Sequence, residues 1–158
     1  SEEDYPYFDP DCEEITYEYY HGYCKMDKEG KKVLYPFGYG LSYTEFAIGK
    51  PEAAVFADTA KISVSLKNTG KMKGAEVVQL YVGCEGSRVD RPVKVLKDFA
   101  RVELMPGEET KVCLSVSKAD MAYFDEEKDA FVTEDIKYTA YVGNCSAAEA
   151  LQKVEFTF

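Results

Sequence analysis

The sequence predicts an all-β fold, an antiparallel β-sandwich of two sheets preceded by an irregular, tyrosine-rich extension. After residue 43, short runs of alternating apolar and polar residues follow one another, with turn-forming residues between them. Such runs are typical of half-buried strands, and no strongly amphipathic helical stretch interrupts them. Nine of the thirteen tyrosines lie at or before Tyr43, so the composition changes there. We therefore expect residues 1–42 and residues 43–158 to differ in structure.

The extension opens on an acidic stretch. The first eighteen residues carry eight Asp or Glu and no Lys or Arg. Neither helical periodicity nor clean strand periodicity is visible in residues 1–42, beyond the short stretch 15–20. We expect such a segment to depend on other parts of a protein for its packing.

The first clear strand is predicted over residues 60–67, where apolar and polar residues alternate strictly. Ile62, Val64 and Leu66 fall on one face, because side chains alternate across a strand. Residues 68–70, Asn-Thr-Gly, end this run with turn-forming side chains. The strand is therefore expected to bury one face and to expose the other.

The remaining elements are predicted in the same way, from alternation and from turn signals such as Pro106-Gly107. Further strands are expected over residues 75–82, 93–104, 111–117, 136–142 and 151–158. Residues 118–121 are expected to form one helical turn, and a hairpin is expected to join 122–124 to 131–133 across 125–130. Seven or eight short strands of this kind are typical of an immunoglobulin or fibronectin type III sandwich. The chain has no Trp, so the Cys-Trp-Cys set of true immunoglobulin domains is missing.

Charge and hydropathy narrow the classes of partner. The formal net charge of -10 disfavours nucleic acids and anionic membranes as partners, because both repel an acidic surface. No apolar run approaches the roughly 20 residues that a membrane-spanning helix needs, and the acidic start of the chain does not resemble a signal peptide.

The five cysteines, an odd number without close pairs, do not resemble a disulfide framework. We expect free thiols in a reducing compartment, which favours a cytoplasmic over a secreted location.

Candidate metal ligands are sparse. His21 is the only histidine, and with Cys12 and Cys24 it would give three ligands. Structural zinc usually takes four ligands from close pairs such as C-x2-C, and this chain lacks them. The sequence therefore predicts no metal and no other cofactor.

Four ordered segments of the chain resemble the C-terminal region of family 3 glycoside hydrolases, the β-glucosidase and β-xylosidase family. The first is Tyr-Pro-Phe-Gly-Tyr-Gly-Leu-Ser-Tyr-Thr at residues 35–44, followed by Phe46. The other three cover residues 68–82, 91–108 and 141–146. In that family the matching region is a fibronectin type III-like domain that follows an α/β sandwich domain and, usually, a catalytic (β/α)8 barrel.

The resemblance implies that the chain consists of two parts. Residues 1–42 would be a connector and the end of the preceding α/β sandwich domain, and residues 43–158 would be the fibronectin type III-like accessory domain. The chain departs from the family pattern at Phe131, often Trp, at Glu134-Asp135, which lacks a Gly, and at Cys24, where a basic residue is common. These departures leave open whether β-linked glucosides or xylosides are the substrates of the parent protein.

Catalysis by this chain is not expected. Retaining glycosidases need two carboxyl groups about 5 to 5.5 Å apart. The family takes its nucleophile, an Asp, from the barrel and commonly its acid/base, a Glu, from the α/β domain, and neither family motif occurs here. The sequence therefore predicts no catalytic residue, and a hydrolase activity is expected of the parent protein only.

The clustered aromatic side chains of the extension are the candidate contact residues. They could cover an interface with the remaining domains of the parent, since four buried rings would supply on the order of 600 Å². The alternative is stacking on sugars in an independent carbohydrate-binding module, and a cell-surface adhesion module rests on fold analogy alone. Domain docking is the preferred interpretation. The candidate residues are Tyr20, Tyr23, Tyr35, Phe37, Tyr39 and Tyr43.

Overall fold

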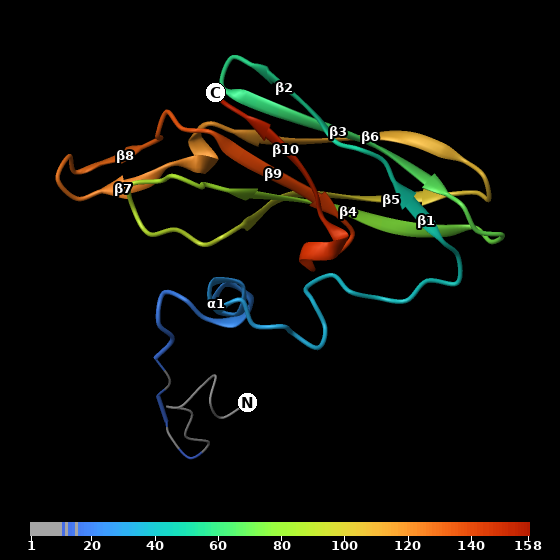
Figure 1. Ribbon diagram of the computed structural model, residues 1–158, viewed down its shortest axis with the longest axis horizontal. Coiled ribbons are helices and arrows are strands. Elements are labelled where there is room, and N and C mark those ends of the chain that lie inside the picture. The colour runs from blue at the N-terminus through green and yellow to red at the C-terminus, as the bar shows by residue number, and fades with distance from the viewer. Residues whose placement is uncertain (1–10, 12, 15) are drawn as a thin grey trace.

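The computed structural model describes residues 11, 13, 14 and 16–158. Two four-stranded antiparallel sheets pack face to face (Figure 1). The first sheet is built on the central strand β3 (Thr59–Asn68), with β6 (Glu109–Ser117) along one edge and β1 (Phe46–Ile48) and β2 (Glu52–Phe56) along the other. The second has the order β10 (Gln152–Phe156), β9 (Tyr138–Gly143), β4 (Gly74–Gly83), β5 (Val95–Leu104). The predicted all-β sandwich is thus confirmed.

The core lies between the two sheets and follows the alternation of the sequence. Ile62, Val64 and Leu66 of β3 are at most 2% exposed. Every second side chain of a strand points to the same side of the sheet, so these three residues point together into the core, as alternate residues of the neighbouring strands do. The further buried residues include Val78, Leu80, Val82, Val112, Leu114, Val116, Tyr138, Ala140 and Val142.

The smaller elements lie at the ends of the sandwich. The 3-10 turn η1 (Ala119–Met121) leads into the hairpin β7 (Tyr123–Asp125) and β8 (Ala130–Val132), close to the predicted positions. A second 3-10 turn, η2 (Ala148–Ala150), separates β9 from β10. The described residues contain ten strands rather than seven or eight, because β1 and β2 were not predicted.

The extension is not irregular throughout, which corrects the sequence-based expectation. Helix α1 (Gly22–Glu29) ends at Gly30, which has φ +64. A left-handed residue at this position lets the following amides bond the last carbonyls of the helix, and Lys31 N donates to Met26 O at 2.9 Å. No residue of α1 is buried, so the helix has no periodic apolar face that the sequence could reveal. The predicted stretch 15–20 begins at Ile15, and Ile15, like Cys12 and residues 1–10, lies outside the described residues.

None of the helices in the described part of the chain has the length and apolarity that crossing a bilayer requires.

Candidate docking interface

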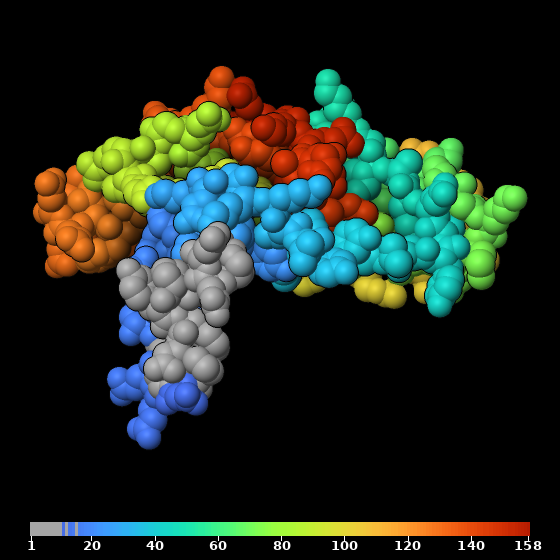
Figure 2. All heavy atoms as spheres, turned by 60° about the horizontal axis from the view of Figure 1, so that its bottom comes forward, coloured from blue at the N-terminus to red at the C-terminus, as the bar shows by residue number. Residues whose placement is uncertain are grey.

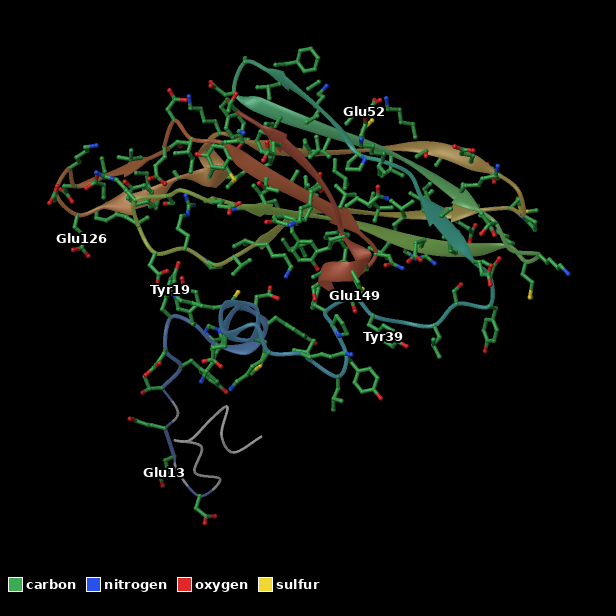
Figure 3. All side chains as sticks on the ribbon, viewed as in Figure 1. Glu13, Tyr19, Tyr39, Glu52, Glu126 and Glu149 are labelled. Carbon is green, nitrogen blue, oxygen red and sulfur yellow. The ribbon has the colours of Figure 1, made fainter. Side chains whose placement is uncertain are left out.

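The N-terminal segment lies across the outer face of sheet β10-β9-β4-β5. In Figure 1, α1 and the chain that follows it run beneath this sheet, and Figure 2 shows them as a continuous band over the sandwich. Tyr19 and Tyr39 lie on this side of the molecule, whereas Glu52 on β2 lies at the opposite face (Figure 3). Three sets of contacts hold the segment there.

The first set joins Phe37 and Gly38 to the end of β9. Phe37 N donates to Ser146 Oγ at 2.9 Å, and Ser146 N donates to Phe37 O at 2.9 Å. Gly38 has φ +82, and a Cβ there would lie 2.0 Å from Gln79 Nε2, so only glycine fits. Gln79, 3% exposed, is itself fixed because its amide donates to Asn144 O at 2.9 Å. We call this contact the Gly38 pin.

The side chain of Gln79 is held from its other end as well. It accepts a hydrogen bond from the hydroxyl of Tyr81. Burial raises the pKa of Tyr81 to about 12, so this hydroxyl keeps its proton at neutral pH and remains a donor.

The second set joins Thr44 to the end of β3. Thr44 Oγ1 donates to Asn68 Oδ1 at 2.8 Å, and the Asn68 amide donates to Met72 O at 2.8 Å and Leu104 O at 3.0 Å. Gly70 N donates to the same Asn68 oxygen at 3.0 Å. Asn68 is fully buried, and its amide uses both its donor and its acceptor ends. We call this contact the Thr44 pin.

Glycines make room for the Thr44 pin. A Cβ on Gly70 would lie 2.2 Å from Thr44 Oγ1, and one on Gly74 would lie 2.6 Å from Thr44 Cγ2. The side chain of Thr44 thus fills the space that two glycines leave open. The Asn-Thr-Gly stretch, which the sequence predicts only as a turn, is therefore also the seat of the connector.

The third set joins α1 to the β4–β5 loop by charge. Asp27 pairs with Lys94, whose side chain is 7% exposed. Lys28 pairs with Asp90 at 2.6 Å and lies 3.7 Å over the ring centre of Tyr20. The hydrogen bond from Lys28 lowers the pKa of Asp90, because it stabilises the ionised carboxylate. These two pairs attach α1, none of whose residues is fully buried, to the loop.

The β4–β5 loop is in turn fixed to the β7–β8 end of the sandwich. Ser87 Oγ donates to Glu134 Oε2 at 2.6 Å, and Arg88 N donates to Glu134 Oε1 at 2.8 Å. The Arg88 guanidinium also bonds Asp125, whose side chain is 4% exposed. Helix α1 thus rests on a loop that the sandwich holds in place.

The structure brings four of the six predicted contact residues together. Tyr23 lies edge-on to Phe37 at 6.0 Å between ring centres, and its hydroxyl donates to Tyr35 O at 3.0 Å. Tyr35 and Tyr39 lie 5.8 Å apart. Each of these four rings is between 43% and 69% exposed.

The other two predicted residues lie apart from this group. Tyr20 packs under Lys28, whose partner Asp90 lies in the β4–β5 loop. Tyr43 is 94% exposed and projects from the connector just before the Thr44 pin. Sequence reasoning missed Leu34 and Leu41, each 92% exposed, although their position among the aromatics of the same segment was a usable signal.

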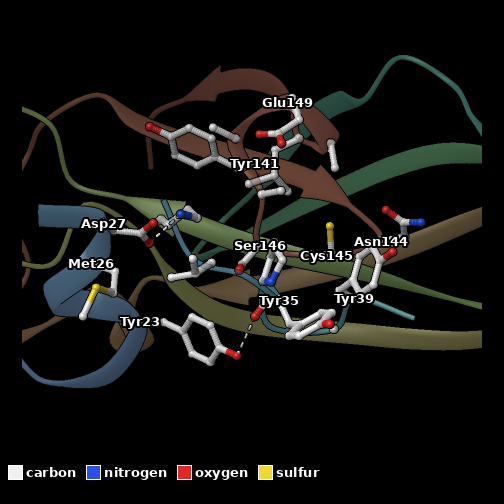
Figure 4. A pocket seen from close by; sticks show the side chains of 18 of the residues that line it. Tyr23, Met26, Asp27, Tyr35, Tyr39, Tyr141, Asn144, Cys145, Ser146 and Glu149 are labelled. Carbon is white, nitrogen blue, oxygen red and sulfur yellow. Dashed lines mark hydrogen bonds and ion pairs between the residues drawn. The ribbon is translucent and has the colours of Figure 1, made fainter. Parts of the chain in front are cut away.

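A groove of about 950 Å³ separates the segment from the sandwich. One wall carries Tyr23, Tyr35 and Tyr39, and the other carries Tyr141 and the turn η2 with Glu149 (Figure 4). Within the described residues, no three His, Cys, Asp or Glu side chains are grouped closely enough to hold a metal ion. His21 Nδ1 instead contacts Glu18 O at 2.9 Å, and Cys12 lies outside the described residues.

Comparison with known proteins gives this arrangement a context. Residues 76–146 match the family model "Fibronectin type III-like domain". The chain is 41% identical over 132 residues to beta-glucosidase BoGH3A of Bacteroides ovatus, which covers 80% of this chain and 17% of that protein. It is 40% identical over 145 residues to the probable beta-glucosidase H of Neosartorya fischeri, which covers 87% of this chain and 17% of that protein. The chain therefore spans about one sixth of the length of these relatives.

Solved structures agree in fold. The beta-glucosidase of Kluyveromyces marxianus, in complex with glucose, superposes with a TM-score of 0.79 at 41% identity, over 87% of this chain and 17% of that one. The GH3 beta-glucosidase of Bifidobacterium adolescentis gives a TM-score of 0.80 at 34% identity, over 87% of this chain and 20% of that one. In each case the similarity covers one part of a much longer polypeptide.

Proposed function

We infer a function from the premise that this chain corresponds to the C-terminal fibronectin type III-like domain of a family 3 glycoside hydrolase. The chain is a non-catalytic accessory domain that docks on the remaining domains of its parent and stabilises them. The parent hydrolyses O-glycosyl bonds of β-linked glucosides, or of xylosides, with carboxylates that lie outside this chain. The β-glucosidase names of the relatives favour glucosides.

The observation that carries the docking role is the difference between the outer faces of the two sheets. The outward residues of β3 and β6 are lysines, serines, one threonine, one glutamate and one cysteine, a surface that water solvates well. The outer face of β4 and β9 is covered by a segment rich in aromatic residues, many of them still exposed. An exposed apolar cluster with a polar rim marks an interaction surface. This face therefore supports contact with the rest of the parent.

The proposed division of the chain follows the Thr44 pin. Residues 43–158 would be the accessory domain, because Thr44 is the first of the described residues along the chain that is buried. Residues 1–42 would be the connector and the end of the preceding domain. We extend the proposal to a reducing compartment, since Cys24, Cys84, Cys113 and Cys145 are free thiols.

Deletion of residues 43–158, the proposed accessory domain, from the full-length parent tests the proposal. The expected result is a protein that loses activity on an aryl β-glucoside much faster on heating, while the purified 158-residue chain turns over no substrate. A deletion that leaves the rate of thermal inactivation unchanged contradicts the accessory role. Turnover by the purified chain, lost on substitution of one of its own carboxylates, contradicts the non-catalytic role.

Calorimetry of the purified chain with cello- and xylo-oligosaccharides addresses the carbohydrate-binding alternative. We expect no heat at millimolar ligand, because the tilted ring pair Tyr35–Tyr39, at 43°, offers no flat platform to a sugar. Saturable heat that disappears in Tyr35→Ala would favour the binding module instead.

A further inference from the structure

Residues 39–43, which we call the strap, form a bridge between the Gly38 pin and the Thr44 pin. All five strap residues are exposed, and a Cβ on Gly40 would have no atom within 4 Å. The strap therefore touches the sandwich at its two ends and stands free between them.

Both ends of the strap are fixed by buried polar groups. Gln79 at one end is 3% exposed, and Asn68 and Thr44 at the other are 0% and 8% exposed. A segment of five residues between two such anchors has lost much of its conformational entropy already. A pre-organised segment binds a partner without losing that entropy again.

The strap presents two large apolar side chains to solvent. Leu41 is 92% exposed and Tyr43 is 94% exposed, against 63% for Phe56 on the opposite face of the sandwich. A single exposed apolar residue is ordinary. Two of them on one short segment that is fixed at both ends are more than the scattered single residues of an ordinary surface, and exposed apolar groups that gather in this way mark interfaces.

We propose that the strap is a pre-organised docking element whose Leu41 and Tyr43 side chains insert into apolar pockets on the part of the parent polypeptide outside this chain. The proposal rests on the proposed accessory function, and it assigns the anchors of that contact. About five sixths of the length of the relatives lies outside the matching region, so a protein of this kind carries further polypeptide on which the strap can dock.

The charge of the segment indicates which side chains surround the apolar pockets of the partner. Residues 22–44 carry four lysines against one aspartate and one glutamate, whereas the whole chain has a net charge of -10. Lys28 and Lys31 are paired with Asp90 and Glu29 within the chain. The remaining excess of positive charge in the segment favours acidic side chains around the partner's apolar pockets.

Hydroxyl-radical footprinting of the full-length parent tests the proposal without any substitution. After correction for intrinsic reactivity, we expect Leu41 and Tyr43 to be oxidised at least about tenfold more slowly than Phe56 and Phe131, although both are more exposed in the structure of the chain. Oxidation of Leu41 and Tyr43 as fast as that of Phe56 overturns the proposal.

The same footprinting data test two properties separately, namely docking of the N-terminal segment and the role of the strap as its anchor. If Tyr23 and Phe37 are protected while Leu41 and Tyr43 react freely, docking stands and the strap is not its anchor. If all four react as freely as Phe56, the docking function itself fails.

Alanine variants of the full-length parent give the energetic test. Leu41→Ala and Tyr43→Ala should each shorten the half-life of thermal inactivation about tenfold, because each removes a large buried apolar contact. Phe56→Ala, on the opposite face, is the matched control and should leave the half-life unchanged. Equal half-lives for all three variants overturn the proposal, and protection in footprinting with a shortened half-life supports it.

Discussion

Asn68 is the residue on which the seat of the connector depends, and Asn68→Ala should destabilise the chain strongly. The substitution removes four hydrogen bonds at once, to Thr44, Gly70, Met72 and Leu104. The bonds to Thr44 and Leu104 are buried, so water cannot replace the lost partner there. An orphaned buried polar group costs about 1–3 kcal/mol, while a part-buried one regains water at a smaller loss.

Two buried orphans and two part-buried ones together give a loss of about 3–5 kcal/mol in the free energy of unfolding. That is a large share of the roughly 5–15 kcal/mol that typical domains have. Thr44→Val removes only one of the four bonds and keeps the shape of the side chain, so its expected loss is about 1–2 kcal/mol. Thr69→Val is the matched control, because Thr69 is exposed, and its effect should stay within about 0.5 kcal/mol.

Urea unfolding of the purified chain, followed by far-UV circular dichroism, measures these losses. The midpoint should shift while the slope stays constant, since the surface exposed on unfolding hardly changes. A loss below about 1.5 kcal/mol for Asn68→Ala would show that the four bonds do not act as a buried network. A Thr69→Val loss equal to that of Thr44→Val would show that the hydroxyl bond of Thr44 is irrelevant.

Three further predictions concern the other contacts. Gly38→Ala should release the connector and raise amide exchange in α1 and residues 30–42, whereas Gly86→Ala, at φ +89 with open space, should not, although both glycines have positive φ. Lys94→Met should also raise exchange in α1, because it breaks the most buried ion pair of that helix; Lys111→Met, which breaks an exposed pair at 3.8 Å, is the control and should have no effect. Burial raises the pKa of Tyr138 to about 12 in the folded chain, from 10.0, so only the unfolded chain ionises there between pH 10 and 12. The contribution of this group to stability should be constant well below pH 10 and fall above it by up to about 1.4 kcal/mol per pH unit. Burial also raises the pKa of Tyr81 to about 12, so Tyr138→Phe should remove part of the decline in urea midpoints measured at pH 9, 10 and 11.

The sandwich could be predicted from the sequence because its long strands have one buried face and one solvated face. In β3 the apolar side chains of Ile62, Val64 and Leu66 alternate with lysines and serines, so the period of the strand is visible directly. At the end of β2 the alternation does not match burial, since the apolar side chain of Phe56 points outward and is 63% exposed. Short edge strands such as β1 and β2 carry too few residues to establish a period.

Helix α1 was missed for a different physical reason. Two of its attachments are the pairs Asp27–Lys94 and Lys28–Asp90, which join residues more than sixty positions apart. Local periodicity reports burial of a face, and α1 buries none of its residues. Ion pairs with a distant loop leave no periodic pattern in the sequence of the helix.

The contact residues show the same limit. Their identity as exposed aromatics was predictable, because a short stretch with four aromatics, a proline and two glycines is unusual. The groups that position them were not predictable, since Phe37 meets Ser146 and Thr44 meets Asn68 only in the folded chain. Asn68 shows this most clearly, because the sequence does not distinguish an asparagine that forms a turn from one that is fully buried and hydrogen-bonded.

Polar contacts, rather than apolar burial, attach the connector to the sandwich. The Gly38 and Thr44 pins use hydrogen bonds and glycine contacts, which fix position and direction and occupy little apolar surface. The large apolar side chains between them, Leu41 and Tyr43, stay free for another surface. If apolar burial held the strap to the sandwich, those same side chains would be used up within the chain. Polar attachment therefore separates two tasks, since directional bonds set the geometry of the connector while its apolar groups remain available for docking.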